Sequence, residues 1–191
     1  MRYLLFIFSI CLLACNSSSP KDENYESRHS TAFNHSVDSL INTYSRLSEA
    51  FVNWDSAKIP SISNDLDKRF QELNLGELDS SLTSTATESI THSRVSLQEL
   101  AGSASLEFKR HSFDRLTQNL YDLLRGIQYD SRKLYLQECP MAFTEEGKGT
   151  WLTGSGKDSI RNPYLGKYHP KYGDGMLECG ENKSTLDFQK K

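Results

Sequence analysis

The spacing of apolar residues between positions 36 and 127 constrains the fold more than any other feature of this chain. Large apolar side chains recur there every three or four residues, which is the period of one face of an α-helix. Gly76 and Gly102 interrupt the pattern, and Ser105 is a predicted N-cap. The apolar positions are Val37, Leu40, Ile41, Tyr44, Leu47, Phe51 and Trp54 in a first helix, Ile59, Ile62, Leu66, Phe70 and Leu73 in a second, Leu82, Ala86, Ile90, Leu97 and Leu100 in a third, and Leu106, Phe113, Leu116, Leu120, Leu124 and Ile127 in a fourth.

Helices of this length are marginal alone and need each other's apolar faces. Short connections between four such helices favour an up-down bundle. We therefore predict a mainly α fold, with a four-helix bundle over residues 33–128 followed by a loop-rich tail over residues 129–191 that packs on it and contains short strands.

The first 14 residues have the pattern of an export signal. Arg2 precedes an apolar run that is too short to span a bilayer. The tetrad Leu12-Leu13-Ala14-Cys15 resembles a bacterial lipobox, which implies cleavage before Cys15 and lipidation of that residue. The alternative is an ordinary signal peptide cut elsewhere. The polar stretch 15–32 is predicted to be a disordered tether.

A lipid on Cys15 would anchor the protein in the cell envelope, on the outer membrane, in either the periplasmic or the surface-facing leaflet. The full chain has a formal net charge of −3, which becomes −4 when Arg2 leaves with the signal (−3 − 1). Without a basic run, the chain is not expected to bind nucleic acid. The expected contact is with the membrane, through the lipid anchor.

The tail contains two short clusters of sulfur-bearing side chains. They are Cys139-Pro140-Met141 and Met176-Leu177-Glu178-Cys179. Glycines and prolines from residue 140 to 180 leave room only for turns and short strands, and we predict strands at 134–137 and 150–153. A loop region this long is usually functional or held together by a cross-link such as a disulfide.

One interpretation of the two clusters is a metal site. Thiolate and thioether ligands suit Cu(I) and similar soft metals. Cys139 and Met141 lie on one face of an extended stretch, and Met176 and Cys179 on one helical turn. Together they would form a four-sulfur site, with His169 as an additional candidate ligand.

The other interpretation is a disulfide between Cys139 and Cys179. It would close a loop of about 40 residues, worth roughly 3–4 kcal/mol in the chain-entropy model. Met141 and Met176 would then be ordinary apolar residues. The residues leave both interpretations open. They contain no paired-carboxylate, Ser/His/Asp or HExxH pattern, so we do not predict an enzyme.

Four blocks of the tail, with the helical positions Arg110, Phe113, Leu116 and Leu120, resemble the DUF3347 family over residues 35–182. The blocks are Tyr135 to Phe143, Gly149 to Leu152, Ile160 to Gly166 and Met176 to Gly180. The insert 167–175 departs from the family's shorter turn.

The resemblance implies a helical bundle with a Cys/Met tail, in secreted or lipid-anchored proteins of Bacteroidetes-type bacteria. The domain is also similar to segments attached to membrane-fusion subunits of heavy-metal efflux pumps. We therefore expect a lipid-anchored protein that binds Cu(I)-like metal and assists efflux. The alternative is a non-enzymatic structural or interaction module with a Cys139–Cys179 disulfide and no metal.

Overall fold

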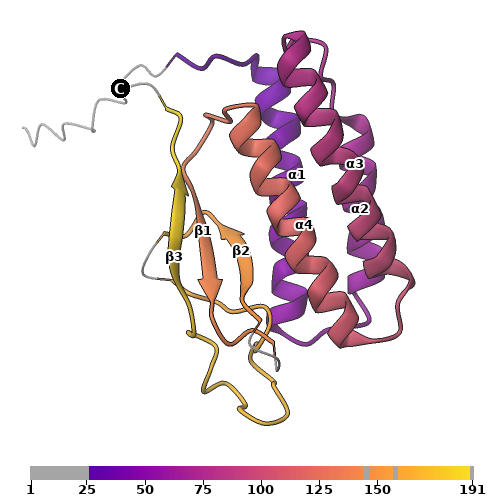
Figure 1. Cartoon of the computed structure of the whole chain (residues 1–191), viewed down its shortest axis with the longest axis vertical. Coiled ribbons are helices and arrows are strands. Elements are labelled where there is room, and N and C mark those ends of the chain that lie inside the picture. The colour runs from indigo at the N-terminus through magenta and orange to yellow at the C-terminus, as the bar shows by residue number, and fades with distance from the viewer. Residues whose placement is uncertain (1–25, 144–146, 157–158, 190–191) are drawn as a thin grey trace, which may run out of the picture.

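The computed structural model describes residues 26–143, 147–156 and 159–189, and its larger part is a bundle of four helices (Figure 1). Consecutive helices are joined by short links and contact each other in sequence order. The mainly α fold and the predicted helical bundle are confirmed. The helices are α1 (Thr31–Val52), α2 (Ile59–Glu72), α3 (Ser80–Gly102) and α4 (Leu106–Gly126).

Local sequence signals explain where these helices begin. The side chains of Ser30, Asp79 and Ser105 each accept a hydrogen bond from a backbone N–H in the first turn of α1, α3 and α4. Helix α2 has no such cap, but Pro60 lies in its first turn, where a missing N–H has no cost. The predicted N-cap at Ser105 is confirmed.

The tail forms a three-stranded antiparallel sheet beside the bundle (Figure 1). Its strands are β1 (Leu134–Cys139), β2 (Gly149–Thr153) and β3 (Glu181–Leu186), and β1 lies between the other two. The strands predicted at 134–137 and 150–153 are present and slightly longer. Strand β3 was not predicted, because it is polar and mostly exposed and so has no apolar alternation to reveal it.

Strand β2 attaches the sheet to α1 and α4. The Tyr44 hydroxyl lies 2.7 Å from Thr117 Oγ1 of α4 and accepts a hydrogen bond of 3.2 Å from the backbone N–H of Leu152. Asp114 of α4 accepts hydrogen bonds from both the backbone N–H and the hydroxyl of Thr150, at 2.7 and 2.8 Å. These buried polar contacts fix the position of the tail on the bundle.

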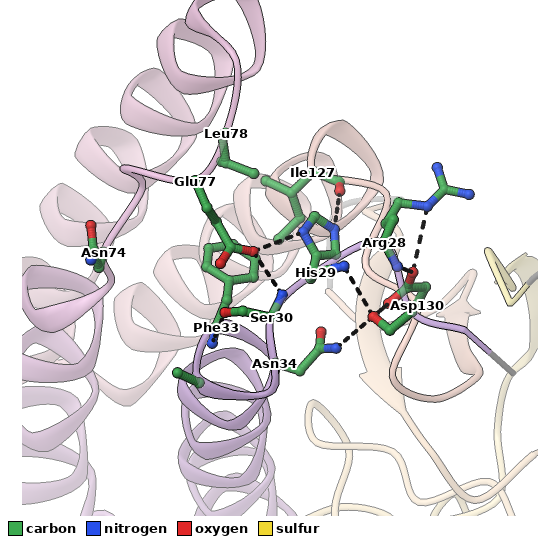
Figure 2. A network of polar contacts seen from close by, with 12 residues as sticks. Arg28, His29, Ser30, Phe33, Asn34, Asn74, Glu77, Leu78, Ile127 and Asp130 are labelled. Atoms are coloured by element: carbon green, nitrogen blue, oxygen red, sulfur yellow. Dashed lines mark hydrogen bonds and ion pairs between the residues drawn. The ribbon is translucent and has the colours of Figure 1, made fainter.

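Residues 26–30, here called the N-terminal strap, run across one end of the bundle before α1 starts (Figure 2). Asp130, which follows α4, accepts hydrogen bonds from the Ser27 hydroxyl at 2.7 Å and the Arg28 backbone N–H at 2.9 Å. The Arg28 guanidinium also lies 3.4 Å from this carboxylate. The strap is therefore tied to the segment that leaves α4.

The histidine of the strap bridges two other elements. His29 Nε2 lies 2.8 Å from the carbonyl oxygen of Ile127, and its Nδ1 lies 3.4 Å from Glu77 in the α2–α3 link (Figure 2). The predicted tether over 15–32 thus includes a folded end, and α1 begins at Thr31. The sequence does not predict this folded end, because the strap residues are polar and have no apolar pattern.

The predicted signal over 1–14 and the lipidation site Cys15 lie outside the described residues. Within the described part, none of the helices is long and apolar enough to cross a membrane.

Candidate functional site

The two cysteines of the tail meet where β1 ends and β3 is about to begin. Cys139 is the last residue of β1, and Cys179 lies two residues before β3. Antiparallel pairing places Glu138 opposite Glu181, which carries Cys179 back to Cys139. Their Sγ atoms are 2.7 Å apart, and both thiols are free. The Cys139 side chain is fully buried.

Asn162 holds the segment that carries Cys179. Its side-chain amide donates to the carbonyl of Cys179 at 2.8 Å, and its backbone N–H donates to the carbonyl of Leu177 at 2.8 Å. Its Oδ1 accepts from the backbone N–H groups of Tyr164 and Leu165, at 2.8 and 3.0 Å. One buried side chain therefore fixes both the turn at 163–165 and the chain around the thiol.

The separation of the two sulfurs favours a bond between them over a shared metal ion. A disulfide bond is about 2.05 Å long, so the observed 2.7 Å needs only a small approach. Two thiolates each about 2.3 Å from one tetrahedral ion would lie about 3.8 Å apart. The thiols would have to separate to take an ion between them.

Burial raises the pKa of the Cys179 thiol, and its hydrogen bond with Cys139 raises that pKa further. A raised pKa leaves the reduced Cys179 thiol protonated near neutral pH. The thiolate is the form that attacks electrophiles and binds metals. This environment therefore suits a structural pair better than a nucleophile.

The structure divides the five predicted metal ligands between two places. Met176 lies one turn before Cys179, since the Cys179 N–H donates to the Met176 carbonyl at 3.1 Å, and it packs against the core. Met141, by contrast, is 57% exposed and lines a groove together with His169. Neither cysteine lines that groove. The groove therefore brings Met141 and His169 together, while the two cysteines meet outside it.

Nor do other residue types offer a metal centre in the described ranges. Among residues 26–143, 147–156 and 159–189, no group of three or more His, Cys, Asp or Glu side chains is placed to hold an ion.

The groove that contains Met141 and His169 is here called the Arg110 groove. It has a volume of about 490 Å³ and lies between the start of α4 and the tail. This groove could not be predicted from the sequence, because its walls come from three separate stretches of the chain. Its lining residues are Glu107 and Arg110 from α4, Pro140 to Phe143 and Lys148 from the β1–β2 connection, and Tyr164, Leu165, His169, Lys171 and Tyr172.

Trp54, just after the end of α1, contacts two residues that line this groove, Arg110 and His169. The N–H groups of Trp54 and Asp55 donate to the carbonyls of Phe51 and Ala50, which is a Schellman ending. The left-handed position of this motif is usually glycine, yet here it is Trp54, with φ of 54°. The Arg110 guanidinium lies 4.1 Å from the ring centre, and the His169 ring meets Trp54 edge-on.

Comparison with known proteins finds one family. The model of the family described as "Protein of unknown function (DUF3347)" matches residues 40–132. The predicted resemblance is confirmed over this range, which covers most of α1 and all of α2 to α4. The four tail blocks on which the resemblance also rested lie outside the matched residues. No curated protein and no solved structure matches the chain.

Proposed function

We propose that this protein, whose residues 40–132 belong to the DUF3347 family, is a lipid-anchored envelope protein that acts as a non-enzymatic interaction module. Its tail would be closed by a disulfide between Cys139 and Cys179. The observation that carries the proposal is the 2.7 Å contact between two Sγ atoms that are 40 residues apart in the sequence.

The predicted compartment supplies the chemistry that the bond requires. Closing the disulfide removes two protons and two electrons from the thiols, and the electrons pass to a disulfide of an envelope oxidant by thiol–disulfide exchange. Extracytoplasmic compartments keep such bonds oxidised. The predicted signal and lipobox at Cys15 would direct the protein to such a compartment.

The shape of the molecule supports an interaction role. The strap and the last described residues lie at one end, and the loops between β2 and β3 project from the other (Figure 1). A tether from Cys15 would enter at the strap, so those loops would face away from the membrane. Two large apolar side chains of the loops are exposed there, Tyr168 by 60% and Tyr172 by 43%.

The test is to measure which cysteines of the full chain carry free thiols, using protein produced in a bacterial host that processes lipoproteins. Without reductant, alkylation followed by mass analysis should leave Cys139 and Cys179 unlabelled; after reduction, both should be labelled. The matched variant Cys139→Ser should leave Cys179 labelled without reductant. Two reactive thiols in the unreduced wild-type protein would refute the proposal.

The anchor has its own test. Cys15→Ala should move the protein from the membrane fraction to the soluble fraction without changing the alkylation of Cys139 and Cys179. A protein that stays soluble with Cys15 intact would refute the anchor and leave the disulfide result standing.

A second candidate is Cu(I) binding by the reduced pair, with delivery to a heavy-metal efflux system. The observation that favours it is the meeting of Cys139, Cys179 and the Met176 turn in one part of the fold. Such a site would exclude Met141, because that side chain lines the separate groove. This is a three-ligand proposal, and it requires the thiols to separate and lose their protons.

An anaerobic Cu(I) titration of the reduced protein tests this candidate. Cys139→Ser and Cys179→Ser should each lower the affinity at least tenfold, and Met176→Leu should lower it less. Met141→Leu is the matched control and should leave the affinity unchanged. Equal affinity in wild type and both cysteine variants would reject the candidate.

A further inference from the structure

Arg110 is a buried cation whose hydrogen-bonding capacity is largely unused by the described residues. Its side chain stacks on Trp54, and the whole residue is only 7% exposed. Within the described residues, its Nε is buried and has no hydrogen-bond partner. The carboxylate of Glu107 lies 3.5 Å from this guanidinium, is half exposed and also faces His111. Such a guanidinium is costly to bury without further acceptors.

The polar side chains around Arg110 have mostly one sign of charge. Among the described lining residues of the Arg110 groove, Lys171 and Lys148 add two cations, against the single carboxylate of Glu107; Lys148 also pairs with Glu138 at 3.1 Å, outside the lining. His169 accepts hydrogen bonds at Nδ1 from the backbone N–H groups of Lys171 and Tyr172, which leaves its Nε2 as an N–H donor. The groove thus offers donors from several directions to an acceptor.

The floor of the groove is apolar. Its base is formed by the buried residues Ala142, Tyr164 and Leu165, and Met141 and Tyr172, 57% and 43% exposed, add accessible apolar surface. A volume of about 490 Å³ lies within the range of sites for small organic molecules. An inorganic ion would use the cations and leave this apolar surface uncovered.

We propose that the Arg110 groove binds a small organic anion. Its carboxylate would pair with the Arg110 guanidinium, aided by Lys171 and Lys148, and its apolar part would lie against Met141 and Tyr172. Arginine is suited to this role because its planar donors match a carboxylate in pairs. The proposal goes beyond the interaction function and does not depend on the state of the thiols.

The strained position of Trp54 agrees with this assignment. A non-glycine residue at positive φ costs on the order of 1–2 kcal/mol, and strained backbone persists mainly where it serves a function. Here the strained backbone places the face of the Trp54 indole against Arg110, and this contact holds the guanidinium in position. Ligand binding at Arg110 should therefore change the fluorescence of Trp54.

The experiment uses the full chain as the host produces it, with phenylacetate as the probe. Calorimetry and tryptophan fluorescence should show phenylacetate binding, and the neutral isostere phenylacetamide should bind at least tenfold more weakly. Inorganic phosphate should also bind at least tenfold more weakly than phenylacetate. Equal binding of the amide would overturn the role of the charge, and equal binding of phosphate would overturn the role of the apolar floor.

Variants identify the residues responsible. Arg110→Gln should lower phenylacetate affinity at least tenfold, and Lys171→Gln by two- to fivefold. Arg125→Gln, on the same helix about 22 Å further along at 1.5 Å per residue, is the matched control and should bind as wild type does. Unchanged binding by Arg110→Gln would overturn the proposal.

Two further variants keep the test decisive. Arg110→Lys retains the charge without the paired donors and should bind between wild type and Arg110→Gln, which covers the case in which Arg110→Gln unfolds. Cys139→Ser should bind phenylacetate as wild type does. Loss of binding in that variant alone would show that the groove depends on the thiol pair, and would overturn their independence.

Discussion

The side-chain amide of Asn162 donates a hydrogen bond to the carbonyl of Cys179, with the two atoms 2.8 Å apart. Because the Asn162 side chain is fully buried and its Oδ1 accepts hydrogen bonds from two further backbone N–H groups, its loss would leave several buried polar groups unpaired. We expect Asn162→Ala to lower the free energy of unfolding by about 2–4 kcal/mol. Urea denaturation of the oxidised proteins measures this.

Asn64→Ala is the matched control for this substitution. Asn64 is exposed in the middle of α2, and alanine has the higher helix propensity, so its stability should change by less than about 0.5 kcal/mol. Equal stability of the two variants would contradict the role assigned to Asn162.

Gly166 and Gly173 form a matched pair that separates backbone strain from crowding. Both have positive φ, 59° and 56°, but a Cβ at Gly166 would lie 2.5 Å from Trp54 Nε1 and one at Gly173 would meet nothing within 4 Å. Gly173→Ala should therefore cost only about 1–2 kcal/mol of strain. Gly166→Ala should cost about 1–3 kcal/mol more, because its Cβ would overlap Trp54 and prevent the tail from packing closely against the end of α1.

Thermal and urea unfolding of both glycine variants check this prediction. Gly166→Ala should also change the tryptophan fluorescence of the native state, since Trp54 must move. Identical losses in the two variants would show that contact with Trp54 has no effect on stability.

The ion pair between Glu49 of α1 and Arg161 of the tail should make stability depend on pH. Arg161 donates to both carboxylate oxygens, at 2.8 and 2.7 Å, and this lowers the pKa of Glu49, while partial burial acts in the opposite direction. A lowered pKa in the folded state means that the contribution is present above about pH 4.5, the usual glutamate value, and is lost as the pH falls through the folded pKa.

Glu49→Gln tests this dependence. Its stability should be lower than wild type at pH 7, and the difference should shrink between pH 4.5 and pH 3 as wild-type Glu49 is protonated. Urea midpoints at pH 7, 5, 4 and 3 measure it, with the exposed Glu72→Gln on α2 as control. A difference that stays constant over this range would contradict the assignment.

Asp130 should control whether the N-terminal strap stays on the bundle. Its carboxylate faces two donors in the strap, so Asp130→Asn would place an amide N–H against one of them. We expect a loss of about 1–3 kcal/mol and faster tryptic cleavage after Arg28. The exposed Asp122→Asn on α4 is the control and should be cleaved at the wild-type rate. Unchanged cleavage of Asp130→Asn would show that other contacts hold the strap.

Much of the bundle could be predicted because helices depend on local signals. The 3.6-residue period, the glycine breaks and the cap at Ser105 placed α2 to α4 within a few residues of their observed bounds. The start of α1 was predicted too late, because the strap is held by Asp130 and Glu77 from distant elements and has no apolar pattern of its own. Strand β3 was missed for a related reason, since its pairing with β1 uses backbone groups that every sequence has.

The candidate sites show the same division. The sequence by itself determined the chemistry available: two thiols, two thioethers, a histidine and scattered cations, joined to four amphipathic helices. Only the tertiary structure decided which of them meet. It paired Cys139 with Cys179 and turned Met141 toward the Arg110 groove. It also set Arg110 on Trp54. The physical reason is the sequence separation of the interacting residues. A helix is fixed by neighbours three and four residues away. The position of the tail depends instead on strand register, on the bulge between Leu136 and Gln137, and on buried polar contacts between segments far apart in the chain.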